Sequence, residues 1–215
     1  MMGDTTEKEL TIFDHTGNTI KTEDREIRIL AKYDEPLVVV LGNVLSDEEC
    51  DELIKHSREQ LQRSKIGGEH AVNQIRTSSG VFCEDSETIT RIERRFSQIM
   101  NIPIEHGDGL QVLLYTPGQE YQPHYDFFAE TSRASANNRI STLVMYLNDV
   151  EEGGETAFPM LNMSVFPNKG MAVYFEYFYS NHELNDFTLH AGTPVIKGEK
   201  WVATMWMRRQ ALRIS

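Results

Sequence analysis

Short runs of β-branched and aromatic residues recur through the second half of the chain, and this pattern restricts the fold more than any other feature. Clusters of Pro, Gly and Asn separate the runs from residue 109 to about residue 208. Examples are Leu110–Tyr115, Ile140–Leu147, Ala172–Phe175 and Trp201–Met207. Many short strands joined by turns are typical of a sandwich or a double-sheet roll. We therefore expect the second half of the chain to be mainly β.

Two strands and a polar segment are predicted at the start of the chain. Residues 26–33 alternate roughly between polar and apolar side chains, as a strand does. Residues 37–41 form a continuous run, Leu-Val-Val-Val-Leu, which suits a buried strand. Residues 1–24 are polar and have no sustained period, so we expect a tail or a loose lead-in.

Two helices are predicted between these strands and the β half. Ser46 and Glu49 form a capping box, in which the serine caps the helix and the glutamate reaches back to its start. Cys50 falls on the apolar face of this helix and is expected to be a small buried hydrophobe. A second helix is expected after Asp85. Its apolar face contains Ile89, Ile92, Phe96, Ile99 and Met100.

The charge of the chain restricts its partners. Asp and Glu number 33 against 21 Lys and Arg, which gives a net charge of −12. Much of the excess lies in residues 1–60, where we expect a solvated acidic surface. An acidic protein of this kind lacks the electrostatic footprint for nucleic-acid backbones or anionic membranes. We therefore expect neither nucleic acid nor a membrane as a partner.

The two cysteines and the chain ends indicate the cellular compartment. Cys50 and Cys83 are too few for a disulfide framework and wrongly spaced for a zinc ribbon. The N-terminus lacks the basic-then-apolar order of a signal peptide, and no apolar run approaches membrane-spanning length. The C-terminus carries no retention signal. We expect a reducing, cytoplasmic setting.

A His-x-Asp motif in the β half is a candidate metal site. In a strand, residues two apart point to the same face, so His124 and Asp126 can converge on one metal while Tyr125 points away. A second imidazole would complete the 2-His-1-carboxylate triad of non-haem Fe(II) oxygenases, which leaves three positions open. The motif alone is weak, because it often arises by chance and a hydrogen-bonded surface histidine explains it better.

The third ligand must come from elsewhere, and two histidines of the β half are candidates. His190 lies in an apolar, strand-like segment followed by a turn, and we assign it as the ligand. His182 lies in a polar segment and is expected to be a solvent-facing loop residue. The other histidines have no partner at a suitable spacing and are expected to be incidental. They are His15, His56, His70 and His106.

Lys200 begins an otherwise apolar strand, ten residues after His190. An inward-facing ammonium group needs an anion to compensate its burial. The ordinary explanation is a lysine at the strand entry whose ammonium group reaches back to water. The nearby His190 makes us favour the inward-facing interpretation.

In this order and spacing, His124, Asp126, His190 and Lys200 resemble the prolyl 4-hydroxylase branch of the 2-oxoglutarate dioxygenases. The resemblance covers about residues 37–208. It includes the segments Leu45–Cys50, Arg76–Gly80 and Glu152–Pro159. The related oxygen-sensing prolyl hydroxylases and the lysyl hydroxylases usually have Arg where Lys200 stands, and Arg and Lys bind carboxylates differently. The match therefore favours the collagen-type and the bacterial or plant-like enzymes. The large collagen enzyme of the secretory pathway is not expected as a whole-chain match, because its signal, peptide-binding domain and retention tail have no counterpart here.

The resemblance implies a fold and a domain plan. Such enzymes use a double-stranded β-helix, a jelly-roll form, with the metal between the sheets. The length suits one domain. We expect a polar lead-in over residues 1–24 and a single dioxygenase domain over residues 25–215. Within this domain, residues 46–100 are expected to give helical support and residues 109–208 the catalytic jelly-roll core, so the fold class is mainly β with flanking helices (α+β).

The resemblance also implies a cofactor site. The 2-oxoglutarate would chelate Fe(II) through its C1 carboxylate and C2 ketone, and Lys200 would pair with its C5 carboxylate. Tyr115 and Thr156 match positions that donate hydrogen bonds to the same carboxylate, although a core tyrosine and a strand threonine explain them nearly as well. Gly153 and Gly154 are more simply explained as a turn that permits positive φ.

The implied reaction is the hydroxylation of peptidyl proline to 4-hydroxyproline. It consumes O2 and converts 2-oxoglutarate to succinate and carbon dioxide, and the cofactors supply the chemistry while the protein positions them. No catalytic residue beyond the metal ligands is expected. Whether ascorbate is also required is left open.

Four residues correspond to family positions near the peptide proline. Tyr121, Arg139 and Trp206 would form part of a groove whose aromatic walls suit a polyproline-type segment. Core aromatics and a surface arginine are an equally good explanation. Arg76, in the polar stretch 76–80, would belong to a loop that folds over the peptide, or to an ordinary surface loop.

Three other functions are compatible with part of the pattern. A cupin-like metal-binding module without activity explains the triad and leaves Lys200 unexplained, and a structural β-sandwich that contacts partners explains neither. A dioxygenase acting on a free amino acid or another side chain is the enzymatic alternative. The substrate protein stays open between collagen-like repeats and an intracellular factor. A homodimer is left open too, because the N-terminal segment has no other predicted role.

Overall fold

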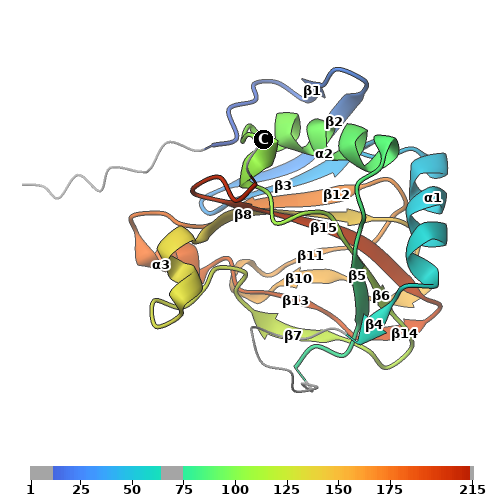
Figure 1. Ribbon diagram of the computed structural model, residues 1–215. Helices are drawn as coiled ribbons and strands as arrows, with labels where there is room; N and C mark the ends of the chain where they lie inside the picture. Colours follow the sequence, from blue (N-terminus) through green and yellow to red (C-terminus); the bar gives the residue numbers. More distant parts are fainter. Residues whose placement is uncertain (1–11, 64–74, 214–215) are drawn as a thin grey trace, which may run out of the picture.

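The computed structural model describes residues 12–63 and 75–213, and its main element is a nine-stranded antiparallel sheet (Figure 1). In order across the sheet, the strands are β1 (Thr19–Lys21), β2 (Glu26–Asp34), β3 (Leu37–Gly42), β12 (Ala172–Glu176), β8 (Arg139–Tyr146), β15 (Lys200–Arg208), β6 (Gln111–Tyr115), β5 (Ser79–Phe82) and β4 (Gln62–Arg63). Six strands predicted from apolar or alternating runs lie in this sheet, as β2, β3, β6, β8, β12 and β15. The predicted helical region, residues 46–100, also contributes β4 and β5 at one edge.

A second sheet faces the first. It contains β11 (Met163–Val165), β10 (Thr156–Phe158), β13 (His190–Gly192) and β7 (Tyr121–His124). A separate pair is formed by β14 (Val195–Lys197) and β9 (Glu152–Gly153). Phe158 of the small sheet and Phe175 of the large one meet edge to face, with ring centroids 5.2 Å apart, in the hydrophobic layer between the sheets. The predicted mainly β, double-sheet fold is confirmed.

Two helices cover the outer face of the large sheet (Figure 1). They are α1 (Asp47–Arg58) and α2 (Glu87–Met100). The predicted capping box is present in α1, where the Glu49 amide donates to Ser46 Oγ at 3.2 Å and the Ser46 amide donates to Glu49 Oε2 at 2.9 Å. The remaining helices are short: α3 (His182–Asp186) and the 3-10 turns Ile104–His106, Arg133–Asn137 and Pro159–Leu161. Among the described residues, no helix combines the length and the apolar character needed to cross a bilayer.

Strand β15 is buried on both faces, and its alternation sorts its side chains into two groups. Trp201, Ala203 and Met205 pack in the layer beneath the helices. Lys200 and Trp206 belong to the other face and line the cleft between the sheets. This alternation explains how an almost entirely apolar strand can also supply polar groups to a site.

The N-terminal segment is not a loose lead-in where the structure describes it, so that prediction is wrong for residues 12–24. Phe13 and Ile20 are 3% and 2% exposed, and β1 pairs with β2. The Phe13 amide also donates to Glu176 Oε1 at 2.7 Å. Two apolar residues seven positions apart produce no periodic signal, which is why the sequence did not reveal this packing. Residues 1–11 of the predicted lead-in, and His70, lie outside the described residues.

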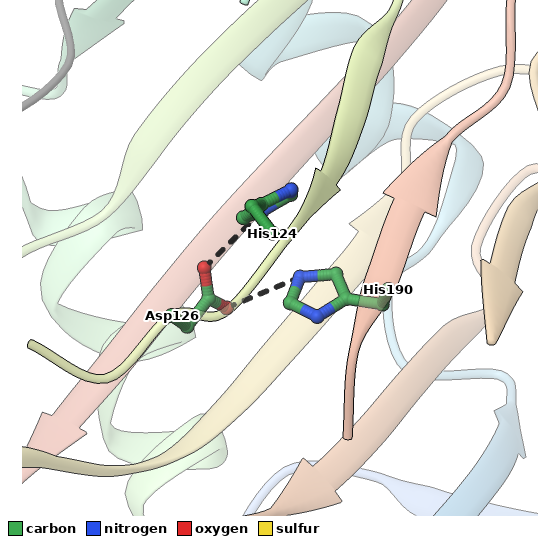
Figure 2. A group of neighbouring side chains, drawn as sticks. All are labelled: His124, Asp126 and His190. Carbon is green, nitrogen blue, oxygen red and sulfur yellow. Dashed lines mark ion pairs between the residues drawn. The ribbon is translucent and has the colours of Figure 1, made fainter. Parts of the chain in front are cut away.

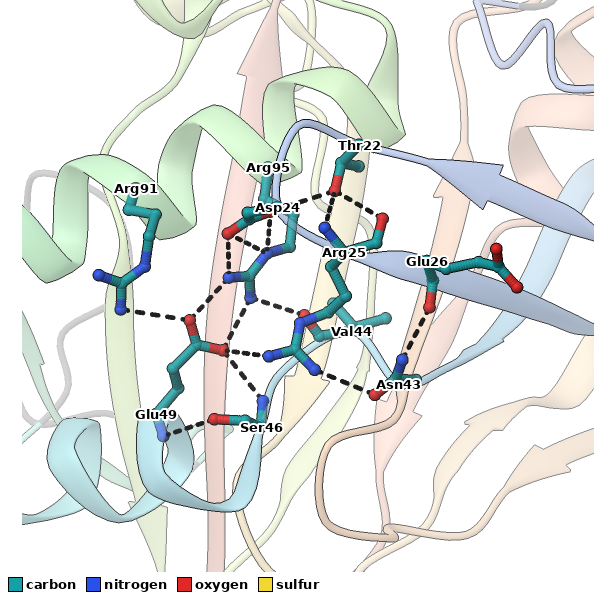
Figure 3. A network of polar contacts seen from close by, with 10 residues as sticks. All are labelled: Thr22, Asp24, Arg25, Glu26, Asn43, Val44, Ser46, Glu49, Arg91 and Arg95. Atoms are coloured by element: carbon teal, nitrogen blue, oxygen red, sulfur yellow. Dashed lines mark hydrogen bonds and ion pairs between the residues drawn. The ribbon is translucent and has the colours of Figure 1, made fainter.

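A buried arginine ties this segment to both helices (Figure 3). The side chain of Arg95 on α2 is 1% exposed and contacts Asp24 Oδ2 at 2.5 Å and Glu49 Oε1 at 2.7 Å. It also donates to the Val44 carbonyl at 2.9 Å. Burial would raise the pKa of Glu49, but hydrogen bonds from Arg95 and the Ser46 amide together lower it. The carboxylate that caps α1 therefore also anchors α2.

Candidate active site

The two histidines of the predicted triad come from neighbouring strands of the small sheet. His124 ends β7 and His190 begins β13, and the two residues are direct partners in the antiparallel register. Their ring centroids are 4.3 Å apart. Asp126 lies just after the end of β7, in a bend, and its carboxylate points between the two rings (Figure 2). The predicted convergence therefore occurs, although Asp126 reaches the site from the bend and not from within the strand.

Each carboxylate oxygen of Asp126 faces one imidazole. Oδ1 lies 3.5 Å from Nε2 of His124, and Oδ2 lies 3.5 Å from Nε2 of His190 (Figure 2). The ligand atoms of the three side chains all lie within 4.8 Å of one another. Among the described residues, no other group of three His, Cys, Asp or Glu side chains could hold a metal.

Backbone carbonyls fix the orientation of both imidazoles, which the sequence could not show. His124 Nδ1 lies 2.8 Å from the Gln122 carbonyl, and His190 Nδ1 lies 3.0 Å from the Thr188 carbonyl. A carbonyl oxygen only accepts, so Nδ1 carries the hydrogen in each ring and Nε2 keeps its lone pair for a metal. Burial lowers the pKa of His190 to about 4, which leaves this imidazole neutral near pH 7.

Two residues that sequence reasoning missed hold the carboxylate. The Thr142 hydroxyl donates to Asp126 Oδ2 at 2.7 Å, and the Tyr177 hydroxyl lies 2.9 Å from the same threonine oxygen. Burial would raise the pKa of Asp126, but the two neighbouring histidines and Arg139 lower it below its usual range. The aspartate is therefore ionised, as a metal ligand must be. Thr142 and Tyr177 lie on or next to β8 and β12, and no motif in the sequence connects them to Asp126.

Lys200, Tyr115 and Thr156 lie in the same cleft as the triad. Lys200 is 3% exposed, so it does not extend to water as a strand-entry lysine would. Burial lowers its pKa to about 8, against a smaller opposing effect of Glu155. Its Nζ lies 5.5 Å from the Tyr115 ring centroid. Within the described part of the chain, no carboxylate lies within 4.0 Å of this ammonium group, as expected for a lysine that binds an anionic ligand.

Local backbone features shape this end of the cleft. Tyr146, on β8, donates its hydroxyl to Thr156 Oγ1 at 2.8 Å, which leaves the threonine hydrogen free to point at a ligand. Gly154 has a φ of +74°, as the sequence predicted for the Gly153–Gly154 turn. A Cβ added at Gly154 would lie 3.3 Å from Cδ of Lys200, so glycine also leaves room for the lysine stem.

The groups present fit Fe(II) and 2-oxoglutarate. Two imidazoles and one ionised carboxylate on one side of a cleft form the donor set that non-haem Fe(II) oxygenases use. A buried lysine with a hydroxyl beside it suits a carboxylate at the other end of the same cleft. An inert metal module would leave Lys200 unexplained.

Comparison with known proteins identifies the family. Residues 110–208 match the 2OG-Fe(II) oxygenase superfamily. The chain is 37% identical over 219 residues to probable prolyl 4-hydroxylase 10 of Arabidopsis thaliana, covering 90% of this chain and 75% of that protein. It is also 37% identical over 207 residues to prolyl 4-hydroxylase 5 of the same plant, covering 84% and 71%. The chain belongs to the prolyl 4-hydroxylase family.

A solved structure supports the same assignment for the fold. The 2-oxoglutarate complex of the viral collagen prolyl hydroxylase from Paramecium Bursaria Chlorella virus-1 superposes with a TM-score of 0.65 at 31% identity, over 80% of this chain and 95% of that one. This prolyl 4-hydroxylase family member is therefore a 2-oxoglutarate-dependent dioxygenase with a jelly-roll core, and its cofactors are Fe(II), 2-oxoglutarate and O2. The predictions of fold, enzyme class and cofactors are confirmed, and the non-enzymatic alternatives are set aside.

The four residues predicted near the substrate line one cleft beside the triad of this prolyl 4-hydroxylase family member. Tyr121 stacks on the His124 ring at a centroid distance of 3.4 Å. The Arg76 guanidinium lies 5.0 Å from the Tyr121 ring centroid, and the residue is only 7% exposed. Ser79 and Gly80 begin β5. Part of the stretch 76–80 is therefore strand, and Arg76 forms a β-bridge with Tyr121, while its role toward a peptide stays a prediction.

Arg139 and Trp206 also line this cleft. The Arg139 guanidinium lies 4.1 Å from the Trp206 ring centroid and pairs with Asp108 Oδ2 at 2.7 Å. Trp206 is 5% exposed, and its indole N–H has no acceptor among the described residues. Arg139 is thus a fixed arginine beside the metal site and not a free surface side chain. His182 is exposed as predicted, although it begins α3 and is not in a loop.

Proposed function

We propose that the protein hydroxylates proline residues of a peptide or protein at C4. The observation that carries this proposal is the single cleft in which His124, Asp126 and His190 converge at one end and Lys200 is buried at the other. The names of the related plant enzymes and of the viral enzyme support proline as the substrate.

The protein residues act by binding and positioning. We assign His124, Asp126 and His190 to Fe(II), and Lys200, Tyr115 and Thr156 to the C5 carboxylate of 2-oxoglutarate. Once bound, Fe(II) and 2-oxoglutarate supply the oxidising chemistry, in which O2 is consumed, succinate and carbon dioxide form, and a substrate C–H bond is hydroxylated. Thr142 holds Asp126 in its ligating orientation, and the carbonyls of Gln122 and Thr188 hold the rings.

The substrate is assigned to the cleft formed by Tyr121, Arg76, Arg139 and Trp206. Its aromatic walls and the guanidinium groups of Arg76 and Arg139 suit an extended segment whose backbone carbonyls need donors. Both collagen-like repeats and a proline in an intracellular factor are compatible with this cleft.

Three further parts of the proposal concern the setting of the enzyme. A cytoplasmic location is supported by the two cysteines, which are both free thiols and too few to form a disulfide framework. A requirement for ascorbate is proposed on the family resemblance alone. A homodimer stays part of the proposal, although residues 12–24 of the N-terminal segment pack on their own sheet. Native mass spectrometry would measure the oligomeric state.

The experiment that tests the function compares substrates directly. Purified protein is incubated with Fe(II), 2-oxoglutarate and either a panel of proline-rich peptides or free amino acids, with and without ascorbate. Mass spectrometry is expected to show the gain of one oxygen on proline in peptides, together with succinate. Oxidation of a free amino acid while every peptide stays unmodified would support the enzymatic alternative.

A further inference from the structure

Asp108 lies outside the residues assigned so far, and it contacts two residues of the substrate cleft, Arg139 and Trp206. Its side chain is 8% exposed and lies between two arginines. Oδ2 accepts from Arg139 Nε at 2.8 Å and lies 2.7 Å from Nη2 of the same residue. Oδ1 accepts from Arg208 Nε at 2.5 Å. The Asp108 amide also donates to the Trp206 carbonyl at 3.0 Å.

We propose that Asp108 is a positioning residue for substrate binding, and this inference rests on the proposed function. Arg139 and Arg208 both lie over the Phe128 ring, each with Cζ 4.9 Å from its centroid. Two guanidinium groups that share one ring repel each other unless an anion lies between them. Asp108 is that anion, and its Oδ2 contacts two nitrogens of Arg139, Nε and Nη2, which fixes the plane of the guanidinium.

The fixed plane determines where the remaining donors of Arg139 point. Asp108 occupies Nε–H and one N–H of Nη2, and Nη1 donates to the Asp126 carbonyl at 3.3 Å. One N–H of each terminal nitrogen is left for a substrate. Since Asp108 binds Arg139 through its side chain and the Trp206 carbonyl through its amide, it fixes these two residues of the cleft relative to each other.

The test uses Asp108→Asn, which keeps the shape and removes the charge. The KM for a proline-rich peptide is expected to rise about ten-fold, equivalent to about 1.4 kcal/mol, while kcat and the affinity for 2-oxoglutarate stay close to wild type. The matched control is Glu93→Gln. Glu93 is an equally buried carboxylate, 2.7 Å from Arg213 and outside the cleft, and its loss is expected to leave the peptide KM unchanged.

A rescue variant separates positioning from a general structural role. Adding Arg208→Gln to Asp108→Asn removes one of the two guanidiniums and is expected to restore part of the peptide affinity. A purely structural loss would become worse in the double variant. An unchanged peptide KM in a stably folded Asp108→Asn protein, or an equal loss of 2-oxoglutarate affinity, would overturn the proposal.

A second readout needs no substrate, so it also decides the matter if the enzyme hydroxylates no proline peptide. In a Trp201→Phe background, Trp206 is the only tryptophan. Displacement of Arg139 from its ring is expected to shift the emission and to increase quenching by acrylamide in Asp108→Asn, but not in Glu93→Gln. Identical quenching in both proteins would show that Asp108 does not position Arg139. Failure of the wild type on every peptide would instead refute the proposed function.

Discussion

His190 and His124 are direct partners across two antiparallel strands, and each ring is held by a carbonyl two residues before it in the chain. The site therefore depends on the register of β13 against β7. A slip of one residue would turn His190 to the opposite face of the small sheet. The metal-binding geometry is thus built into the sheet itself, and only Asp126 is supplied by a bend.

Removal of any triad side chain is expected to abolish turnover. His124→Ala, Asp126→Ala and His190→Ala each leave two protein ligands, so Fe(II) content after anaerobic loading is expected to fall together with succinate release. His182→Ala is the control, because this histidine is exposed on α3 and is expected to behave as wild type. Full activity in any of the three ligand variants would mean that the metal binds elsewhere.

Lys200→Ala is expected to weaken 2-oxoglutarate binding by roughly ten-fold to a few thousand-fold. Hydrogen bonds to charged groups contribute about 1.5–3 kcal/mol, and loss of a buried partner costs about 3–5 kcal/mol, at about 1.4 kcal/mol per decade. Anaerobic titration of the Fe(II)-loaded protein measures the affinity. Iron binding is expected to stay unchanged, since Lys200 contacts no triad residue in the proposed site. Unchanged 2-oxoglutarate affinity would remove Lys200 from it.

The affinity for 2-oxoglutarate is expected to fall as the pH rises through about 8. Burial lowers the pKa of Lys200 to about 8, so the amino group of the free enzyme is charged below this pH and neutral above it. Only the charged form attracts the C5 carboxylate strongly. Lys200→Arg binds more weakly, because the planar fork does not fit the same pocket, but its affinity is expected to be flat between pH 7 and pH 9. A flat profile in the wild type would contradict the assignment.

Thr142→Val is expected to lower Fe(II) affinity by about 10- to 100-fold, the usual effect of removing a partner of a metal ligand. The substitution keeps the volume and deletes the 2.7 Å hydrogen bond to Asp126. Thr142→Ser retains the hydroxyl and is expected to bind Fe(II) like the wild type. Metal titration under anaerobic conditions measures both. Equal affinities in the valine and serine variants would exclude Thr142 from the support of Asp126.

Arg95→Ala is expected to reduce the free energy of unfolding by about 3–5 kcal/mol, because it removes the nearest cationic partner of two carboxylates, one of them buried and otherwise in contact only with the more distant Arg25 and Arg91. The two carboxylates are Asp24 and Glu49, at 2.5 Å and 2.7 Å (Figure 3). The neighbouring Arg94 is exposed, and Arg94→Ala is expected to change stability little. Urea denaturation compares the two variants. Similar midpoints would show that the network contributes no net stability.

The parts of the fold that follow local rules were predictable from the sequence. The strands β3 and β15 are continuous apolar runs, and the capping box of α1 lies within four consecutive residues. His124, Asp126, His190 and Lys200 were found by spacing together with a family resemblance. Their roles as ligands stay predictions until metal and cofactor binding are measured.

The remaining features depend on contacts between distant segments, which spacing does not encode. Thr142 reaches Asp126 from another strand, and Asp108 meets Arg139 and Arg208 only because β6, β8 and β15 are neighbours. Phe13 contributes one buried ring from a polar stretch. The bend at Asp126 was not predicted, because the alternation of side chains in a strand was assumed to continue to Asp126. The strand β7 ends two residues earlier, at His124.

The two-sided burial of β15 has a consequence for how such an enzyme can diverge. Trp201, Ala203 and Met205 pack in the layer beneath the helices, whereas Lys200 and Trp206 line the ligand cleft. Selection for substrate specificity and selection for thermal stability therefore act on alternate residues of the same nine-residue strand. A lineage can exchange residues on the ligand side without repacking the helical side, so new specificities can arise on an inherited scaffold.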